Sequence, residues 1–228
     1  MKRTSRLLQR SLVISASLLM FAAVPSLASV VTWTDWTSAT PGSSGVAAGT
    51  IGTIGVTYRG EIAFAQLGSG INYWTEGSPA PYTGNAVVSN APTPSEMIAT
   101  NFADATRTIV FSTPVLNPIL AIVSQGRLSL PVTYDFDKSF SVLSEGQGYW
   151  GDGSYVLGAG DILIGSEFHG VLQFSGLISS ISWSSSPDEY WHGFTVGVAN
   201  PVPEPGTMML LGSGLVGLAG WGRRRFKK

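Results

Sequence analysis

The chain has 228 residues, no cysteine, a hydrophobic share of 44% and a formal net charge of −1. The absence of cysteine excludes disulfides, thiolate metal sites and cysteine nucleophiles within this sequence. The small net charge hides an uneven distribution, because most of the 13 Lys and Arg residues lie near the two ends.

The N-terminal segment has the pattern of a secretory signal peptide. Residues 1–10 carry four cations and no acid, and residues 11–24 are almost entirely apolar. Ser26 and Ala28 then place small residues at positions −3 and −1 of a cut between Ala28 and Ser29. The apolar part is too short for a durable membrane anchor. We therefore predict a signal-peptide helix that is removed after Ala28, which leaves the next domain exported.

Residues 29–200 are predicted to form a single domain, since this length can bury a sizeable core. The domain holds 13 acids and four cations (Arg59, Arg107, Arg127 and Lys138), so its net charge is −9. Such an acidic surface argues against nucleic acid and anionic membranes as partners. No pattern in the sequence specifies an oligomeric state.

Alternating apolar residues predict an all-β domain of about eleven short strands, a single antiparallel β-sandwich or jelly-roll-like fold. The predicted strands cover residues 30–36, 53–58, 61–65, 107–111, 119–124, 132–136, 140–143, 161–164, 171–174, 180–183 and 194–198. The continuous apolar run 119–123 predicts a central strand that is covered on both faces. Residues 69–100 contain four prolines and read as a long ordered loop, with a short helical turn at 95–99 that Ser95 would cap.

Two histidines and several acids are candidates for chemistry. His169 and His192 each follow an acid and precede a glycine, and they could meet at one rim if the strands after them pair. A metal site would add Glu167 and Glu189 as ligands, but we favour histidines that hold turns by hydrogen bonds. The same two glutamates, with Glu145 and Asp188, could supply a carboxylate pair for glycoside hydrolysis. Their spacing does not set the separation that this reaction needs, and no serine lies in a nucleophile elbow, so we predict that the chain is not an enzyme.

Calcium is the one cofactor that the composition suggests. Asp135, Asp137, Asp152 and Gly153 offer oxygen ligands in an acidic domain. Without the spacing of a known calcium loop, solvated loop acids remain the default, and we predict no required cofactor and no metal ligands.

Aromatic residues near turns are the strongest binding candidates. Tyr73, Trp74, Tyr149, Trp150 and Trp191 stand close to glycine and polar residues. Exposed aromatic rings beside Asp, Glu and Asn can stack on sugar rings while the polar groups bind hydroxyls. The alternative is that these rings close the ends of the hydrophobic core, where Trp and Tyr are often half-buried.

The C-terminal segment, residues 201–228, has three parts in a fixed order. Pro203, Glu204 and Pro205 form a stiff, exposed tripeptide that cannot join a helix or strand interior. Residues 207–222 carry no charge and predict a short transmembrane helix, roughly 24 Å long at about 1.5 Å per residue. Arg223, Arg224 and Arg225 begin a basic tail that resists translocation.

This three-part order resembles the PEP-CTERM sorting signal. The resemblance implies a transient partner, an exosortase of the membrane, which recognises the Pro-Glu-Pro region, removes the tail and releases the protein outward. The domain also resembles a recurrent type of PEP-CTERM cargo with no assigned activity. The shared stretches are Trp33-Thr34-Asp35-Trp36, residues 55–58, Gly148-Tyr149-Trp150-Gly151 and residues 189–197.

Together these patterns predict a protein that crosses the inner membrane, is held transiently by its C-terminal helix, and ends at the cell surface or outside the cell. Its role is predicted to be structural or adhesive, in an exopolysaccharide matrix. The alternatives are a carbohydrate-binding module, with polysaccharide as a partner, and a glycan-active hydrolase.

Overall fold

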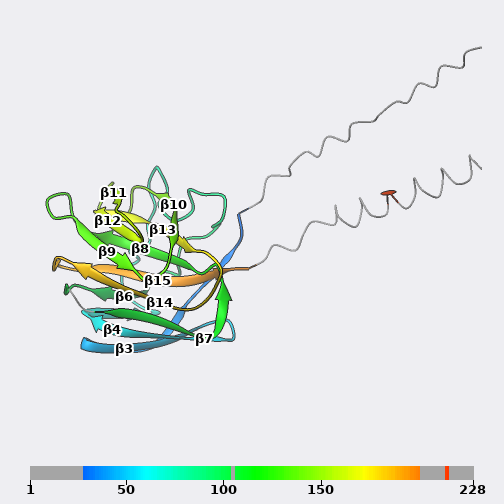
Figure 1. The fold of residues 1–228 in the computed structure, drawn as a ribbon, viewed down its shortest axis with the longest axis horizontal. Coiled ribbons are helices and arrows are strands. Elements are labelled where there is room, and N and C mark those ends of the chain that lie inside the picture. The colour runs from blue at the N-terminus through cyan, green and yellow to red at the C-terminus, as the bar shows by residue number, and fades with distance from the viewer. Residues whose placement is uncertain (1–27, 104–105, 201–213, 216–228) are drawn as a thin grey trace, which may run out of the picture.

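A computed structural model describes residues 28–103, 106–200 and 214–215, and two antiparallel sheets account for most of the first two ranges (Figure 1). The predicted all-β class is confirmed for these residues. The structure has fifteen strands where the sequence predicted about eleven. The predicted N-terminal helix lies outside the described residues, and of the predicted C-terminal helix the structure describes only residues 214–215, which are helical.

The first sheet has seven strands. In order across the sheet these are β10 (Phe140–Glu145), β13 (Phe168–Phe174), β8 (Ile119–Gln125), β15 (His192–Ala199), β6 (Glu96–Thr100) and β5 (Phe64–Leu67), with β1 (Val31–Trp33) also paired to β15.

The second sheet has eight strands. Their order is β11 (Ser154–Leu157), β12 (Ile162–Ser166), β9 (Val132–Phe136), β14 (Leu177–Ser186), β7 (Arg107–Leu116), β4 (Ile54–Ile62), β3 (Gly42–Ile51) and β2 (Asp35–Thr40).

The two sheets face each other across an inner core. Tyr58, Tyr134 and Trp183 of the eight-stranded sheet pack there with residues such as Leu120 and Phe194 of the seven-stranded sheet. Apolar residues alternate on these strands because successive strand side chains point to opposite faces. This packing supplies the main hydrophobic stabilisation of the domain.

The seven-stranded sheet has a second, outer core on its other face. Ile119, Ala121 and Val123 of β8 point into it, while Leu120 and Ile122 point into the inner core. Residues 68–95, here called the covering segment, lie over this face and contribute Trp74, Tyr82 and Val88 to the outer core. The predicted central strand is therefore confirmed as covered on both faces.

The helical turn predicted at residues 95–99 is wrong, because β6 begins at Glu96 and pairs with both β5 and β15. All five residues of β6 are buried, with Ile98 in the inner core and Met97 and Ala99 in the outer core. The pattern of a short apolar stretch fits a helix and a strand equally well. Here the stretch forms a strand because it pairs with β5 on one side and with β15 on the other.

Two predicted strands are each divided between the sheets. Residues 30–36 break at Thr34, whose N–H and hydroxyl both donate to Val196 O, at 2.9 and 2.7 Å. Residues 61–65 break at Ala63, between β4 and β5. A single residue between two strands hardly disturbs the alternation of side chains. The sequence pattern therefore predicted one strand in each place where the structure has two.

Leu120→Ala is expected to destabilise the domain by about 2–5 kcal/mol, because it opens a cavity in the inner core. Leu120 has 0% exposure, whereas Leu116 is 63% exposed. The matched variant Leu116→Ala should change the free energy of unfolding by about 0.5 kcal/mol or less. Urea unfolding followed by tryptophan fluorescence measures both, and equal losses would contradict the two-core arrangement.

Candidate functional site

Connections from both sheets converge on a cleft of about 220 Å³. It lies where β8 and β12 end and β13 and β15 begin. Its lining comes from four separate connections or strand ends and comprises Ser124, Arg127, Trp150, Glu167, Glu189, Tyr190 and Trp191.

Four aromatic rings, here called the aromatic cluster, pack together beside the cleft. Tyr73 and Trp150 are stacked, with ring centroids 5.2 Å apart and planes 18° apart. Trp191 meets both rings edge-on at 5.0 and 4.9 Å, and Tyr149 meets Tyr73 and Trp150 at 5.0 and 4.6 Å. Tyr149 and Trp150 are 42% and 46% exposed, so the cluster presents ring surface to solvent. Burial raises the pKa of Tyr73, and Tyr149 adds to the rise, so this phenol stays protonated.

A tight turn at residues 148–151 positions Tyr149 and Trp150. Gly148 N–H donates to Gly151 O at 2.8 Å, and Gly151 N–H donates back at 3.2 Å. Gln147 N–H also donates to Pro79 O at 2.9 Å, which ties the turn to the covering segment. A Cβ on Gly148 would lie 2.3 Å from the His169 ring, so only glycine fits at this close approach.

The predicted binding residues divide into two groups. Tyr73, Tyr149, Trp150 and Trp191 come together in the aromatic cluster. Trp74 does not, because it is 2% exposed and packs in the outer core with Tyr82, while its Nε1 donates to Glu96 O at 3.2 Å. Trp74 therefore offers no ring face to a ligand. Its burial agrees with the alternative that such rings close the ends of the hydrophobic core.

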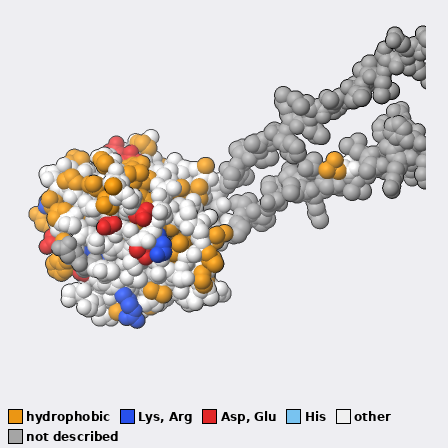
Figure 2. Space-filling view, viewed as in Figure 1, with side chains coloured by type: hydrophobic (Ala, Val, Ile, Leu, Met, Phe, Trp, Pro, Cys, Tyr) orange, Lys and Arg blue, Asp and Glu red, His pale blue; other side chains and the backbone are white. Residues whose placement is uncertain are grey.

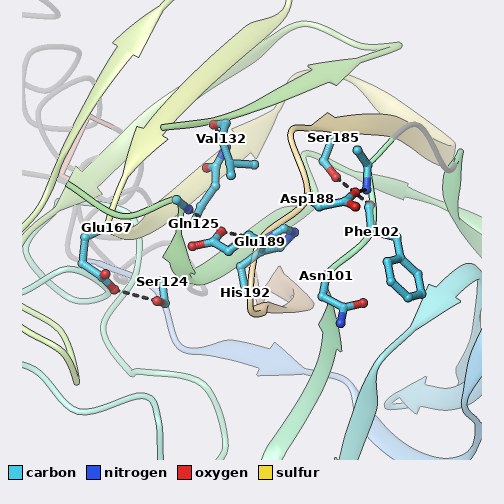
Figure 3. Close-up of polar contacts among 12 residues, drawn as sticks. Asn101, Phe102, Ser124, Gln125, Val132, Glu167, Ser185, Asp188, Glu189 and His192 are labelled. Carbon is cyan, nitrogen blue, oxygen red and sulfur yellow. Dashed lines mark hydrogen bonds and ion pairs between the residues drawn. The ribbon is translucent and has the colours of Figure 1, made fainter. Parts of the chain in front are cut away.

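Glu167 is held at the cleft by Ser124 and His169. Ser124 Oγ donates to Glu167 Oε1 at 2.6 Å (Figure 3). His169 Nε2 lies 3.4 Å from the same oxygen. His169 Nδ1 accepts the backbone N–H of Ser124 at 3.3 Å. The buried histidine thus fixes the end of β8 against the start of β13.

Glu189 is more deeply enclosed. Its Oε2 accepts the Gly126 N–H at 2.8 Å and the His192 Nδ1–H at 3.1 Å, and its side chain is 4% exposed (Figure 3). Its own N–H donates to Asn101 O at 3.0 Å, and the preceding Asp188 accepts the Ala103 N–H. Burial lowers the pKa of His192, against the opposing effect of Glu189, so the imidazole is neutral at pH 7.

Both histidines therefore hold loop residues by hydrogen bonds, as favoured from the sequence. The two histidines lie with Glu167 and Glu189 in the same part of the domain, although β13 and β15 do not pair with each other, because β8 lies between them and pairs with both. Across residues 28–103 and 106–200, no three His, Asp or Glu side chains are grouped so that they could bind a metal ion.

The other acids proposed from the sequence lie away from the cleft lining. Both carboxylate oxygens of Asp137 have partners: Oδ1 accepts the Ser182 N–H at 2.7 Å, and Oδ2 lies 2.8 Å from Lys138 Nζ. Burial and, secondarily, Asp152 raise the pKa of Glu145. The absence of a required cofactor stays a prediction, with calcium at Asp135 and Asp137, or at Asp152 and Gly153, as its alternative.

Sequence reasoning did not select Ser124, Arg127 or Tyr190 as site residues. Arg127 is one of four cations in the domain, and its guanidinium carbon lies 4.7 Å from the centroid of the Tyr190 ring. Because cations are so few in this domain, Arg127 could have been selected from the sequence as a candidate site residue. On the face shown in Figure 2, Lys and Arg side chains form small isolated patches among acidic and hydrophobic ones.

Comparison with known families finds a match at the C-terminal end. Residues 201–225 match the PEP-CTERM protein-sorting motif. The chain carries a PEP-CTERM sorting signal. Such a signal implies recognition by an exosortase, export with transient membrane anchoring, and a final place outside the cell. The searches of curated proteins and of solved structures returned no match.

The PEP-CTERM match covers 25 of the 228 residues and leaves the β-domain without an assigned activity. The sorting residues Pro203, Glu204 and Pro205 and the arginines 223–225 lie outside the described part of the chain. Within the part that is described, no helix is long and apolar enough to cross a bilayer.

Acid is expected to destabilise the native protein more than a His192→Asn variant. Because burial lowers the pKa of His192 in the folded state, the unfolded chain takes up the proton first. The stability from the neutral imidazole is complete above about pH 6.5 and is lost as pH falls through the folded-state pKa. The free energy of unfolding, measured from about pH 8 to 5 by denaturant titration, should therefore fall less steeply for the variant, and parallel curves would refute this assignment.

The sorting signal predicts processing that depends on the exosortase. In cells with the enzyme, mass spectrometry of membrane and medium should find a protein that has lost the residues after the Pro-Glu-Pro tripeptide. The intact tail should persist in an exosortase deletion strain, and after replacement of Pro203, Glu204 and Pro205 by alanine. Pro41→Ala, which changes an exposed proline outside the matched motif, is the control and should be processed normally. Removal of the tail in the deletion strain would contradict recognition by this enzyme.

Proposed function

We propose that the chain is an exported protein of the cell surface or the exopolysaccharide matrix, with a structural or adhesive role exerted by binding polysaccharide in the cleft and on the aromatic cluster. One observation carries the proposal: aromatic rings from three distant segments, at Tyr73, Tyr149–Trp150 and Trp191, converge beside a cleft whose lining also holds a few polar and charged side chains.

The chemistry of the cleft suits a sugar. A pyranose ring has an apolar face that can stack on the half-exposed Trp150, and hydroxyls that need hydrogen-bonding partners at its edge. Ser124, Glu167 and Arg127 provide such partners in the same lining. Sites of this kind combine mostly aromatic walls with a few placed polar groups.

The state of the carboxylates favours binding over hydrolysis. A glycosidase needs one carboxylic acid to protonate the leaving oxygen and a second, free carboxylate as nucleophile or base. Glu189 accepts two hydrogen bonds and is nearly closed off from solvent, while Glu167 accepts one from Ser124. We therefore propose a non-enzymatic protein and keep glycan hydrolysis as the alternative.

The ends of the domain support the proposed export route. Ser29, the residue after the predicted signal-peptide cut, donates its N–H to Val87 O at 2.8 Å. Asn200, just before the matched sorting motif, donates its N–H to Val30 O at 3.0 Å. The β-domain thus begins and ends at neighbouring points, and loss of both flanking segments would leave its hydrogen bonds in place.

Trp150→Ala is expected to weaken binding to the exopolysaccharide of the host at least tenfold, since losing about 1.4 kcal/mol of stacking is a tenfold change. Isothermal titration of protein recovered from the culture medium measures the affinity. Phe102→Ala is the control, because Phe102 is an exposed aromatic residue (51%) outside the cleft lining. Equal effects of the two variants, or no binding by the native protein, would reject the proposed function.

A further inference from the structure

We infer that the sugar unit held in the cleft carries a positive charge, the ammonium group of a deacetylated amino sugar, and that Glu167 binds this group. The inference rests on the proposed polysaccharide binding and names the chemical class of the ligand.

The backbone holds Glu167 in an unusual conformation. Glu167 is the single residue between β12 of one sheet and β13 of the other, and its φ is 59°. Ser124, its hydrogen-bond partner, also has a φ of 59°. Left-handed conformations of this kind cost non-glycine residues about 1–3 kcal/mol and gather at ligand sites.

A β-bulge accompanies this conformation. Between β8 and β13, Gln125 lies opposite Phe168 and Ile122 opposite Gly170, so the register shifts beside Ser124. Bulges re-aim side chains next to functional sites. Among the described non-glycine residues, the other positive φ values belong to Ser95 and Asn117, neither of which lines the cleft. Two of these four strained positions therefore meet in one hydrogen bond at the cleft.

The carboxylate of Glu167 keeps one oxygen open to the cleft. Oε1 is taken by Ser124 and faces His169 Nε2. Oε2 accepts no hydrogen bond from any residue that the structure describes, and the side chain is 16% exposed. Glu189, in contrast, is almost fully enclosed. Glu167 is thus the carboxylate that can meet a ligand.

The aromatic walls favour a cation beside this carboxylate. The face of a Trp or Tyr ring attracts ammonium and guanidinium groups, and Trp150, Tyr190 and Trp191 all line the cleft. Tyr190 already has Arg127 over its ring at 4.7 Å. The charge of −9 over residues 29–200 raises the local concentration of cations. A uronic acid would instead bring its carboxylate into a lining that holds two carboxylates, Glu167 and Glu189, against one cation, Arg127, which is unfavourable.

The size of the cleft limits how much of a chain it can hold. Its volume of about 220 Å³ is below the roughly 300–1,000 Å³ typical of sites for drug-sized ligands. One sugar ring can enter, while its neighbours in the polysaccharide lie along the exposed rings of the aromatic cluster.

Calorimetric titration of the full chain with three tetrasaccharides tests the inference. The probes are the glucosamine tetramer, its N-acetylated form and a galacturonic acid tetramer. The glucosamine tetramer should bind most tightly, and Glu167→Gln should weaken its binding at least tenfold, because a hydrogen bond between charged groups is lost. Asp135→Asn removes the same charge from an exposed position on β9 and should leave binding unchanged.

The comparison of acetylated with free amine needs no variant, so it holds even if Glu167→Gln folds poorly. Equal affinities for the two forms, or a preference for the galacturonic acid tetramer, would overturn the inference. If neutral glycans still bind in a manner that depends on Trp150, the proposed function survives this failure. If none of the three tetrasaccharides and no host exopolysaccharide binds, both the inference and the proposed function fall.

Discussion

The burial of the central strands of the seven-stranded sheet on both faces is the constraint on which the rest of the structure depends. Every residue of β6 and β8 is buried, so this sheet needs a cover on the side away from its partner. Residues 68–95 provide that cover through Trp74, Tyr82 and Val88. The same segment bonds to the 148–151 turn through Pro79 and carries Tyr73 into the aromatic cluster. The covering segment therefore both closes the outer core and helps to form the aromatic cluster.

A buried polar network joins the cleft to the middle of the domain. Glu61 Oε2 lies 3.4 Å from Arg107 Nη2 and accepts the Asn101 N–H at 2.9 Å, with both side chains almost fully buried. Asn101 O in turn accepts the N–H of Glu189, which His192 supports. Removing one member of such a pair is costly, because the other charge is left in an apolar interior. The network thus links residues of both sheets to Glu189 at the cleft.

The sequence predicted the features that side-chain alternation controls: the all-β class and the doubly covered strand at 119–123. It missed β3, since Gly42–Ile51 is rich in small residues that give no apolar pattern. It also treated Tyr73 and Trp74 alike, although neighbouring residues in an extended chain face opposite ways and only one reaches the cluster. The environment of Glu167 depends on its left-handed backbone conformation between β12 and β13. A glutamate in the sequence does not indicate that conformation.

One strand connects the two ends of the molecule. β15 begins at His192, beside the cleft, and ends at Ala199, one residue before the chain leaves toward the sorting motif. Eight residues at about 3.3 Å each separate these points by roughly 25 Å. The cleft and the point where the described domain ends before the sorting motif therefore lie at opposite ends of β15. Under the proposed function, removal of the tail changes where the protein resides and leaves the glycan site, at the far end of β15, unaltered.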